Sequence, residues 1–333
     1  MPKGRKIVIA SLFKGEPKVT DFKIETEELP ALQDGQILCE AEYISVDPYQ
    51  RAYSQRHKVG ATMIGSQVAR IVESRSPDYP VGRHVVGYWG WSDRTVVNPA
   101  PKGEEVLPPM LVPDLGDLPL SLSLGVLGMP GATAYFGLLD ICDPKPGEVV
   151  VVSGAAGAVG SIVGQIARIK GCKVIGIAGS DLKVKWLKEE LGFDYAFNYK
   201  TVNVDKALKE AAPQGVDCYF DNVGGEQSGE VIANMRHRGR ISVCGCISTY
   251  NATKVPMAPV LQMHMVGKEL KMEGFMVGRW WGRWDKAFTE MAQWIREGKL
   301  KYKETVTDGF QNTPQAFIGM LRGENLGKAV VKV

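Results

Sequence analysis

The chain has 333 residues, of which 44% are hydrophobic and 23% are charged, and its formal net charge is +3 at pH 7. This profile is typical of a globular protein and argues against disorder, while the length favours two domains of about 150 residues each. The basic residues are too scattered and the net charge too small for a surface that binds nucleic acid.

The six cysteines and the start of the chain predict a protein of the cytoplasm. No two cysteines have C-x-x-C spacing, so neither a disulfide framework nor a zinc knuckle is indicated. The apolar stretch 7–10 is too short for the core of a signal peptide. The weakly polar run 149–167 approaches membrane-spanning length but is interrupted by glycines and polar residues, so no membrane segment is expected.

The first 125 residues have a β-rich pattern. Segment 37–46 alternates partly between apolar and polar positions after an Asp34-Gly35 turn, and Gly and Pro separate further short runs. Strand-like sequence returns after a predicted helix that stops at Gly298. We therefore expect residues 1–125 and 299–333 to form one domain and residues 126–298 to form another.

From about residue 127, apolar strands alternate with helices, which predicts an α/β fold with a doubly wound parallel sheet. One predicted helix places Val159, Ile162, Val163 and Ile166 on one face and ends at Gly171; another, 284–297, would bury Trp284, Phe288, Met291 and Ile295. The predicted strands cover 149–153, 173–178, 195–198, 216–222, 241–245 and 269–275.

Gly154, Gly157 and Gly160 directly follow the first of these strands and open the next helix. In that context glycines permit a tight turn, a close approach to a pyrophosphate and close packing of the helix on the strand. The amide groups at the helix start then face the negative charge. A flexible linker or a simple packing turn is the alternative, but the strand, turn and helix context favours a dinucleotide site.

The end of the second strand favours NADPH over NADH. An NAD site usually has Asp or Glu about twenty residues beyond the glycines to bind the adenosine ribose. Here Gly179 and Ser180 occupy that place, and Lys183 follows where it can pair with a 2′-phosphate. The alternative is that Asp181 binds the ribose and Lys183 is solvated, although Asp181 looks like the cap of the next helix.

Six segments carry a more specific pattern than the glycines. They read VDPY at 46–49, GMPGATAY at 128–135, FNYK at 197–200, FDNVGG at 220–225, ISTYN at 247–251 and NLGK at 325–328. Together they resemble the zinc-free branch of the medium-chain dehydrogenases/reductases, and specifically the prostaglandin reductase or leukotriene B4 12-hydroxydehydrogenase family. The resemblance covers essentially the whole chain. It implies a Rossmann NADP-binding domain with a β-rich GroES-like catalytic domain, and a homodimer.

The resemblance also implies where each part of NADP would bind. From the residues alone, Tyr199 is better interpreted as a tyrosine at a strand end that packs on its neighbours. The implied contacts are Gly157, Ala158, Val159 and Gly160 for the pyrophosphate, Lys183 and Tyr199 for the 2′-phosphate, Asn222 for the ribose, Cys244, Gly245, Ile247, Ser248 and Tyr250 with Phe275, Met276 and Val277 for the nicotinamide, and Asn325 to close the site.

No metal site is expected. Where zinc alcohol dehydrogenases have a Cys and a Gly-His-Glu motif, this chain has Val46 and Gly-Ser-Gln at 65–67. The histidines lack metal-site spacing, so we interpret them as surface or structural residues; they are His57, His84, His237 and His264.

Without a metal, a reductase needs a substrate whose developing charge can be held by hydrogen bonds, and a conjugated enone suits this requirement. One well-placed donor to the enolate oxygen contributes roughly 3 to 4 kcal/mol. Tyr250 and Tyr49 are the candidate catalytic donors, with a structural role as the alternative for each. Relatives carry a tyrosine where this chain has Gly267, so any role of that tyrosine must be lost or supplied elsewhere.

We therefore expect NADPH-dependent reduction of the carbon-carbon double bond of α,β-unsaturated ketones and aldehydes. The resemblance adds lipid-derived substrates, namely 15-oxo-prostaglandins and alkenals, and the reverse oxidation of a leukotriene hydroxyl. A quinone reductase and a non-catalytic NADPH-binding protein remain alternatives. Arg51, Arg56, Arg279 and Trp280 are further candidates for the pocket lining, with ordinary surface or core positions as the alternative.

Overall fold

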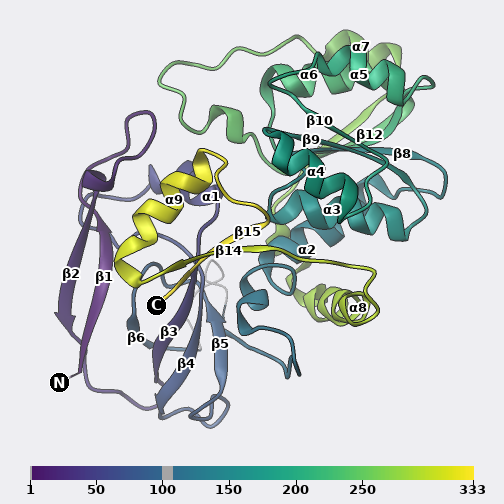
Figure 1. The fold of residues 1–333 in the computed structure, drawn as a ribbon. Helices are drawn as coiled ribbons and strands as arrows, with labels where there is room; N and C mark the ends of the chain where they lie inside the picture. Colours follow the sequence, from purple (N-terminus) through teal and green to yellow (C-terminus); the bar gives the residue numbers. More distant parts are fainter. Residues whose placement is uncertain (1, 100–107) are drawn as a thin grey trace. The chain divides into compact units, whose positions relative to one another are not determined.

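A computed structural model of the chain describes residues 2–99 and 108–333. The chain divides into two compact units (Figure 1). Unit 1 comprises Met1–Leu124, Glu304–Asn325 and Ala329–Val333, and unit 2 comprises Gly125–Lys303 and Leu326–Lys328.

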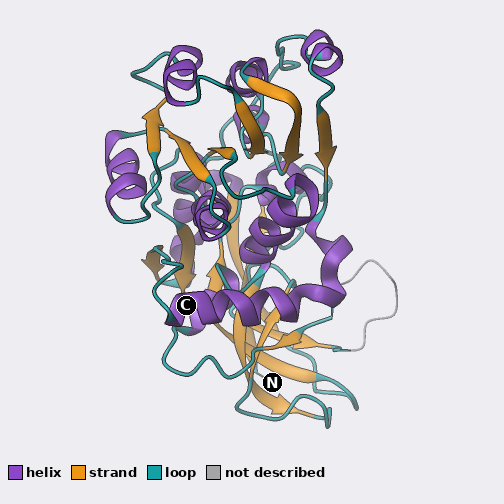
Figure 2. Ribbon diagram, turned by 90° about the vertical axis from the view of Figure 1, so that its right-hand side faces the viewer, coloured by secondary structure: helices purple, strands orange, loops and turns teal. Residues whose placement is uncertain are grey.

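Strands make up most of the regular structure of unit 1 (Figure 2). Its main sheet has the order β14-β15-β3-β4-β5-β7, with β6 on β3, and β1 pairs with β2. Antiparallel pairing of Val330 with Ser45 brings the end of the chain onto β3. The bounds are β1 Lys3–Ile9, β2 Phe22–Glu28, β3 Ile37–Ser45, β4 Gln67–Ser74, β5 His84–Gly87, β6 Arg94–Val97, β7 Met110–Leu111, β14 Glu304–Asp308, β15 Lys328–Lys332, α1 Tyr49–Ser54 and α9 Thr313–Leu321.

The core of unit 1 lies between its strands and helix α9. Trp91 is fully buried, and its ring packs 5.5 Å from Phe22 and 5.6 Å from Phe317, measured between ring centroids. Phe317 belongs to α9, so the returning part of the chain contributes to this core.

Unit 2 contains a six-stranded parallel sheet with the order β10-β9-β8-β11-β12-β13. Because the chain moves outward from β8 in both directions, the sheet is doubly wound, which confirms the expected fold class. Helices α3 and α4 cover one face, and α5 and α6 cover the other (Figure 1). The strands are β8 Val149–Ser153, β9 Lys173–Ala178, β10 Tyr195–Asn198, β11 Val216–Asp221, β12 Met235–Val243 and β13 Lys271–Gly274.

The helices of unit 2 follow the predicted pattern closely. In α3 the side chains of Ile162, Val163 and Ile166 are buried, whereas Val159, predicted on the same face, is only partly buried, and Gly171 ends the helical segment with a φ of 80°. In α8 the prediction for Ile295 is wrong: it is only partly buried, and Trp294 is buried instead. The helices are α2 Met129–Phe136, α3 Ala158–Ile169, α4 Asp181–Glu189, α5 Val204–Ala211, α6 Gly225–Ala233, α7 Gln262–Gly267 and α8 Trp284–Arg296.

The last two strands differ from their predicted bounds. β12 ends at Val243 because the amides of Cys244 and Gly245 both donate to the Asp221 carbonyl oxygen, at 2.8 and 3.1 Å, which turns the chain across the end of β11. β13 begins only at Lys271, after Glu269 adopts a left-handed φ of 48° that is incompatible with a strand.

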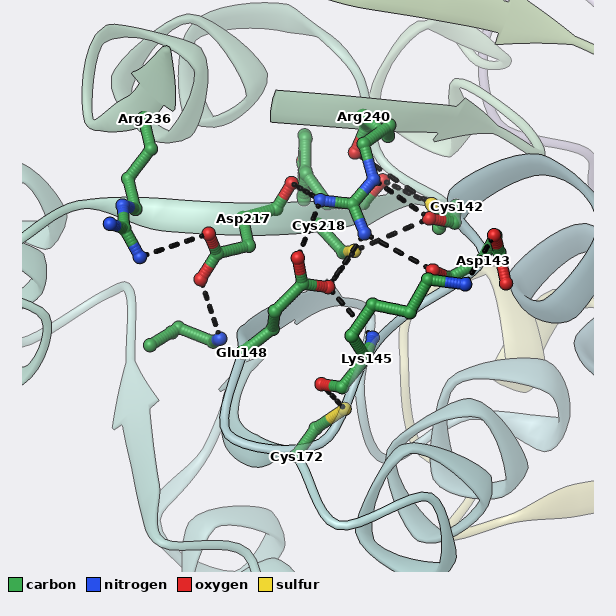
Figure 3. A network of polar contacts seen from close by, with 11 residues as sticks. Cys142, Asp143, Lys145, Glu148, Cys172, Asp217, Cys218, Arg236 and Arg240 are labelled. Carbon is green, nitrogen blue, oxygen red and sulfur yellow. Dashed lines mark hydrogen bonds and ion pairs between the residues drawn. The ribbon is translucent and has the colours of Figure 1, made fainter. Parts of the chain in front are cut away.

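Charged side chains hold the amino ends of β8, β11 and β12 together (Figure 3). The Arg240 guanidinium donates to the Glu148 carboxylate at 2.6 and 3.0 Å and to the Cys142 carbonyl oxygen at 2.9 Å. The Asp217 carboxylate accepts the Val149 amide at 2.9 Å and pairs with Arg236 at 3.2 Å. These ion pairs explain how β12 can contain charged residues in its first half. Because of those charged residues, the hydrophobic pattern predicted a strand only from residue 241.

None of the six cysteines forms a disulfide. Four of them are buried, Cys244 is partly buried and Cys246 is exposed. Among the described helices, none combines the length and the hydropathy needed to cross a bilayer.

Candidate dinucleotide and active site

A tight glycine turn connects β8 to α3. Gly154 has a left-handed φ of 58°, and its carbonyl oxygen accepts the Gly157 amide at 3.0 Å. A Cβ atom on Gly160 would lie 2.4 Å from that same carbonyl oxygen and 2.8 Å from the Ala155 Cα. Both neighbours are backbone atoms that cannot move aside, so only glycine fits at position 160.

The start of α3 presents backbone donors. The Ser161 amide donates to the Gly157 carbonyl oxygen at 3.1 Å, and this is the first bond of the helical pattern. The amides of Ala158, Val159 and Gly160 precede it and therefore point out of the helix start. Together with the helix dipole they form a site suited to a phosphate group.

The returning chain also contacts this turn. The Gly327 amide donates to the Ala156 carbonyl oxygen at 2.9 Å, and Gly157 and Gly327 form a parallel bridge. Gly327 has a left-handed φ of 68°, and a Cβ there would lie 2.1 Å from the Lys303 carbonyl oxygen. Asn325, the residue expected to close the site, lies two positions earlier, within unit 1, and is partly buried.

Lysine and tyrosine side chains gather at the end of β9. A Cβ on Gly179 would lie 3.1 Å from a ring carbon of Tyr199, so a side chain at this position would displace the ring by a few tenths of an ångström. The Lys200 Nζ lies 6.0 Å from the centre of the Tyr199 ring. Burial and the nearby charge of Lys200 lower the pKa of Lys183. The charges of Lys183 and Lys200 therefore lie near enough to influence each other.

Lys200 did not emerge from the sequence as a site residue. Its only signal was its position next to Tyr199 in the FNYK segment. The distance between Lys183 and Lys200 along the chain gives no sign that they are neighbours. The two lysines belong to different βα units, and only the pairing of strands β9 and β10 brings them to the same edge of the sheet.

The expected cap of α4 is wrong by one residue. Ser180 is the N-cap, and its hydroxyl oxygen accepts the Lys183 amide at 3.4 Å. Serine and aspartate cap helices about equally well, so their adjacency left the choice to the backbone. Asp181 is the first residue of the helix, and its carboxylate accepts a hydrogen bond from the Asn198 amide group at 2.8 Å.

Asn222 is anchored at the end of β8, beside the glycine turn. Its side-chain amide donates to the Ser153 carbonyl oxygen at 2.7 Å, and its backbone amide donates to the Ser153 hydroxyl at 2.9 Å. A Cβ on Gly154 would be 3.4 Å from the Asn222 Cβ. The ends of β8 and β11 therefore bring the glycine turn and Asn222 together.

The loop after β12 packs on the same edge. The Ile247 amide donates to the Asn222 carbonyl oxygen at 3.2 Å, and the Ser248 hydroxyl donates to the Val223 carbonyl oxygen at 2.6 Å. The Tyr250 hydroxyl oxygen accepts a hydrogen bond from the Cys246 amide at 3.4 Å. A Cβ on Gly245 would lie 3.0 Å from the same hydroxyl oxygen. Asn222, the loop and the Tyr250 hydroxyl thus form one group of residues.

Segment 275–277 leaves the sheet beside that loop, since Val243 at the end of β12 pairs with Gly274 at the end of β13. Phe275 packs on Trp280, with ring centroids 5.4 Å apart, and Met276 is 64% exposed. Trp280 is buried and stacks on Phe136, so core packing, rather than a surface position, describes it.

Three candidate residues of unit 1 lie in helix α1 or directly after it. Tyr49 begins α1, and its pKa is raised well above its ordinary value by burial and then by Asp47 and Tyr88, so its hydroxyl stays protonated at neutral pH. Arg51 is 1% exposed and donates to the Gly15 carbonyl oxygen at 2.9 Å, which is a structural position. Arg56 is exposed and lies over the Tyr53 ring.

The residues at the places of zinc ligands have structural contacts. Val46 is buried, and the Gln67 side chain donates to the Gly90 and Ser92 carbonyl oxygens at 2.8 and 3.2 Å. Within 2–99 and 108–333, no group of three or more His, Cys, Asp or Glu side chains is arranged to hold a metal ion.

Comparison with known proteins agrees with this description. This arrangement, a doubly wound sheet with a glycine turn at its carboxyl edge, is the one in which dinucleotide-dependent oxidoreductases bind their cofactor. Residues 5–105 match the family described as "N-terminal domain of oxidoreductase", and residues 158–296 match "Zinc-binding dehydrogenase".

Individual relatives cover nearly the full length. Prostaglandin reductase 1 of Bos taurus is 55% identical over 323 residues, 96% of either chain. A 2-alkenal reductase (NADP(+)-dependent) of Nicotiana tabacum is 37% identical and covers 99% of this chain and 97% of its own. The crystal structure of CurA in complex with NADPH from Vibrio vulnificus superposes with a TM-score of 0.89 at 38% identity, with 99% of each chain covered. The chain belongs to the prostaglandin reductase family of medium-chain dehydrogenases/reductases, which confirms the resemblance found in the sequence.

Proposed function

We propose that this protein uses NADPH to reduce the carbon-carbon double bond of α,β-unsaturated ketones and aldehydes. The observation that carries the proposal is full-length membership of a family whose relatives are named prostaglandin reductase and 2-alkenal reductase. The lysines at the end of β9 support the choice of NADPH over NADH, because they supply positive charge where a 2′-phosphate would lie.

The residues present fit the cofactor. We assign Gly157, Ala158, Val159 and Gly160 to the diphosphate, and Lys183 with Tyr199 to the 2′-phosphate. Asn222 would hold the ribose, and Asn325 would close the site. The nicotinamide would be flanked by Cys244, Gly245, Ile247, Ser248 and Tyr250, and by Phe275, Met276 and Val277. Unit 2 is then the nucleotide-binding domain and unit 1 the catalytic domain.

When bound, NADPH supplies the hydride that reaches the β-carbon of the substrate. Electrons then move onto the carbonyl oxygen, and a proton taken up at the α-carbon completes the reduction. The protein must supply donors to the carbonyl oxygen as its charge develops. We assign this role to the hydroxyls of Tyr250 and Tyr49. The Cys246 amide, which donates to the Tyr250 oxygen, helps that oxygen carry partial negative charge while its proton is shared.

Steady-state assays with NADPH and either an enone or a quinone test the activity. We expect turnover of the enone, and we expect Tyr250→Phe to lower kcat/KM by about 100-fold, as the loss of one oxyanion donor does elsewhere. Faster turnover of the quinone would instead identify a quinone reductase. NADPH binding without turnover of any enone, unchanged in Tyr250→Phe, would identify a non-catalytic binding protein.

The substrate is a small molecule, and we further propose that it derives from lipid. The name of the bovine relative supports an oxidised fatty-acid substrate. Comparing kcat/KM for a 15-oxo-prostaglandin, a medium-chain alkenal and a short enone tests this point. Equal values for all three would show that the alkyl chain is not recognised. We place the protein in the cytoplasm, which cell fractionation tests.

We also propose a homodimer that forms through the edge of the unit 2 sheet. β13 is the last strand of that sheet, and the segment before it exposes large apolar side chains, with Val255, Met257 and Met263 at 85%, 86% and 79%. Antiparallel pairing of two copies centred on Met272 would place Lys271 opposite Glu273 of the second copy, so the edge is complementary to itself in charge.

Light scattering on a sizing column tests this assembly. We expect a dimer for the wild type and a monomer for Met263→Glu, which places a charge in the apolar segment. Leu12→Glu is the matched control, because Leu12 is also an exposed apolar residue, at 51%, but belongs to unit 1. A monomeric wild type would contradict the proposal.

A further inference from the structure

Asp221, the last residue of β11, has a buried carboxylate that is surrounded by hydrogen-bond donors. It is 3% exposed, and among the described ion pairs none involves Asp221. Oδ1 accepts the Tyr219 hydroxyl at 2.8 Å, the Ser153 hydroxyl at 3.1 Å and the amides of Val223 and Gly224 at 3.0 and 2.9 Å, and Oδ2 accepts the Ser228 hydroxyl at 2.7 Å.

The chemistry of these donors fits an ionised carboxylate. Backbone amides can only donate, and an acceptor that receives several such bonds is most stable with a full negative charge. The charge is thus held by neutral groups in the interior of unit 2 rather than by a cation. A buried anion of this kind keeps a field that extends to its neighbours.

The negative charge of Asp221 affects the pKa of two neighbouring side chains. Burial and then the charge of Asp221 raise the pKa of the Cys244 thiol to about 12. Burial and then the same charge raise the pKa of the Tyr219 hydroxyl well above its ordinary value. Cys244 opens the loop that we assign to the nicotinamide, so the field reaches the segment beside the reacting ring.

The backbone of Asp221 positions the same loop. Its carbonyl oxygen accepts the amides of Cys244 and Gly245 at 2.8 and 3.1 Å. Its carboxylate meanwhile accepts the amides of the turn that follows Asn222. One residue therefore orders both the ribose segment and the nicotinamide segment.

We propose that Asp221 is a positioning residue whose negative charge favours the oxidised nicotinamide over the reduced one. This inference rests on the proposed function, which places the nicotinamide beside Cys244 and Gly245. The ring is neutral in NADPH and carries a positive charge after it has given up a hydride with its two electrons. A fixed anion nearby stabilises the cationic product, and it lowers the barrier to hydride donation because that charge is developing in the transition state.

Separate titrations of NADP⁺ and NADPH, in the absence of substrate, test this inference. We expect Asp221→Asn to lower the affinity for NADP⁺ relative to NADPH by roughly tenfold, the order of magnitude that the loss of one unit charge produces at a partly desolvated site. Asp221→Ser, which leaves room for a water molecule among the donors, should change the ratio in the same direction. Asp221→Ser serves as the second variant should Asp221→Asn fold poorly.

Ser228→Ala is the matched control, since it removes one donor and leaves the charge. It should weaken both nucleotides alike and keep their ratio within about twofold. An equal loss of affinity for both nucleotides in Asp221→Asn and Asp221→Ser would reduce Asp221 to a structural residue and overturn the inference. A wild type that binds neither nucleotide would instead overturn the proposed function, so the two failures are distinguishable.

Discussion

Strand β11 has an aspartate near each end, and the two aspartates have different hydrogen-bond and charge partners. At the amino end, Asp217 pairs with Arg236, and nearby Glu148 pairs with Arg240 (Figure 3). At the carboxyl end, Asp221 receives only hydroxyl and amide donors. The amino end uses charge pairs to hold strands together, whereas the carboxyl end has an anion held by neutral donors, next to glycine turns. In doubly wound sheets ligands bind at the carboxyl ends, which is where the charge can act on one.

The largest expected effect comes from adding a side chain to the glycine turn at the carboxyl edge of the unit 2 sheet. Gly160→Val should abolish measurable NADPH binding, a loss of more than about 100-fold, because the Cβ meets the Gly154 carbonyl oxygen at 2.4 Å and displaces the amides of the helix start. Gly282→Ala is the control, as a Cβ there has no atom within 4 Å. Fluorescence titration measures both, and normal binding by Gly160→Val would contradict the glycine cradle.

A change at the amino end should affect stability instead. Glu148→Gln breaks a partly buried pair with Arg240, whose side chains are 22% and 21% exposed, and we expect the free energy of unfolding at pH 7 to fall by about 2 kcal/mol. Nucleotide affinity should stay within about twofold of the wild type. Denaturant unfolding and a titration on the same sample test the separation, and a parallel loss of affinity would erase the contrast between the two ends.

The same variant has a pH signature. Burial raises the pKa of Glu148, but hydrogen bonds from Arg240 and the Lys145 amide lower it further, so that the pKa lies below its ordinary value of 4.5. A carboxyl with a depressed folded pKa stabilises the protein above the unfolded pKa and loses that contribution as the pH falls through the folded pKa. The stability gap between wild type and Glu148→Gln should therefore be full at pH 7 and shrink below pH 4.5. A gap independent of pH would show that the carboxylate charge is not involved.

A smaller effect is expected at the end of β9. If the proposed function holds, Lys183→Ala and Lys200→Ala should each weaken NADPH by about tenfold and leave NADH unchanged, since each variant would remove one positive charge beside the 2′-phosphate. Lys185→Ala is the control, because Lys185 lies on the same helix but is 69% exposed and pairs with Glu189. An equal loss for NADPH and NADH would remove these lysines from the 2′-phosphate site.

The smallest expected effect is that of Asp217→Asn, which compares the two aspartates of β11 directly. Asp217→Asn should lower the free energy of unfolding by about 1 kcal/mol, because it removes the charge from the bonds to Val149 and Arg236. The ratio of NADP⁺ to NADPH affinity should not change, in contrast to Asp221→Asn on the same strand. A shifted ratio in Asp217→Asn would mean that any charge in this sheet acts on the nucleotide, and that position is irrelevant.

Much of unit 2 was predictable because its signals are local. The strands over 149–153, 173–178 and 195–198 are short apolar runs with clear turns, and they form with those bounds. The glycine turn was equally clear, since a tight turn between strand and helix requires glycine by steric exclusion alone. Family membership followed from short segments that identify relatives without any three-dimensional information.

The failures have a common physical cause in contacts between distant segments. Arg240 sits within β12 only because Glu148, 92 positions earlier, neutralises it. The end of β12 at Val243 depends on a carbonyl oxygen of β11. Lys200 meets Lys183 only through the pairing of neighbouring strands.

The sequence by itself determined the fold class, the glycine turn and the family, because steric exclusion at glycine and hydrophobic period act between near neighbours. Tertiary structure alone decided the environment of Asp221. Its donors come from β8, β11, the following turn and α6, and no local pattern tells a carboxylate held by such donors from one paired with arginine. The electrostatic difference between the two ends of β11 therefore arises only when the sheet is assembled.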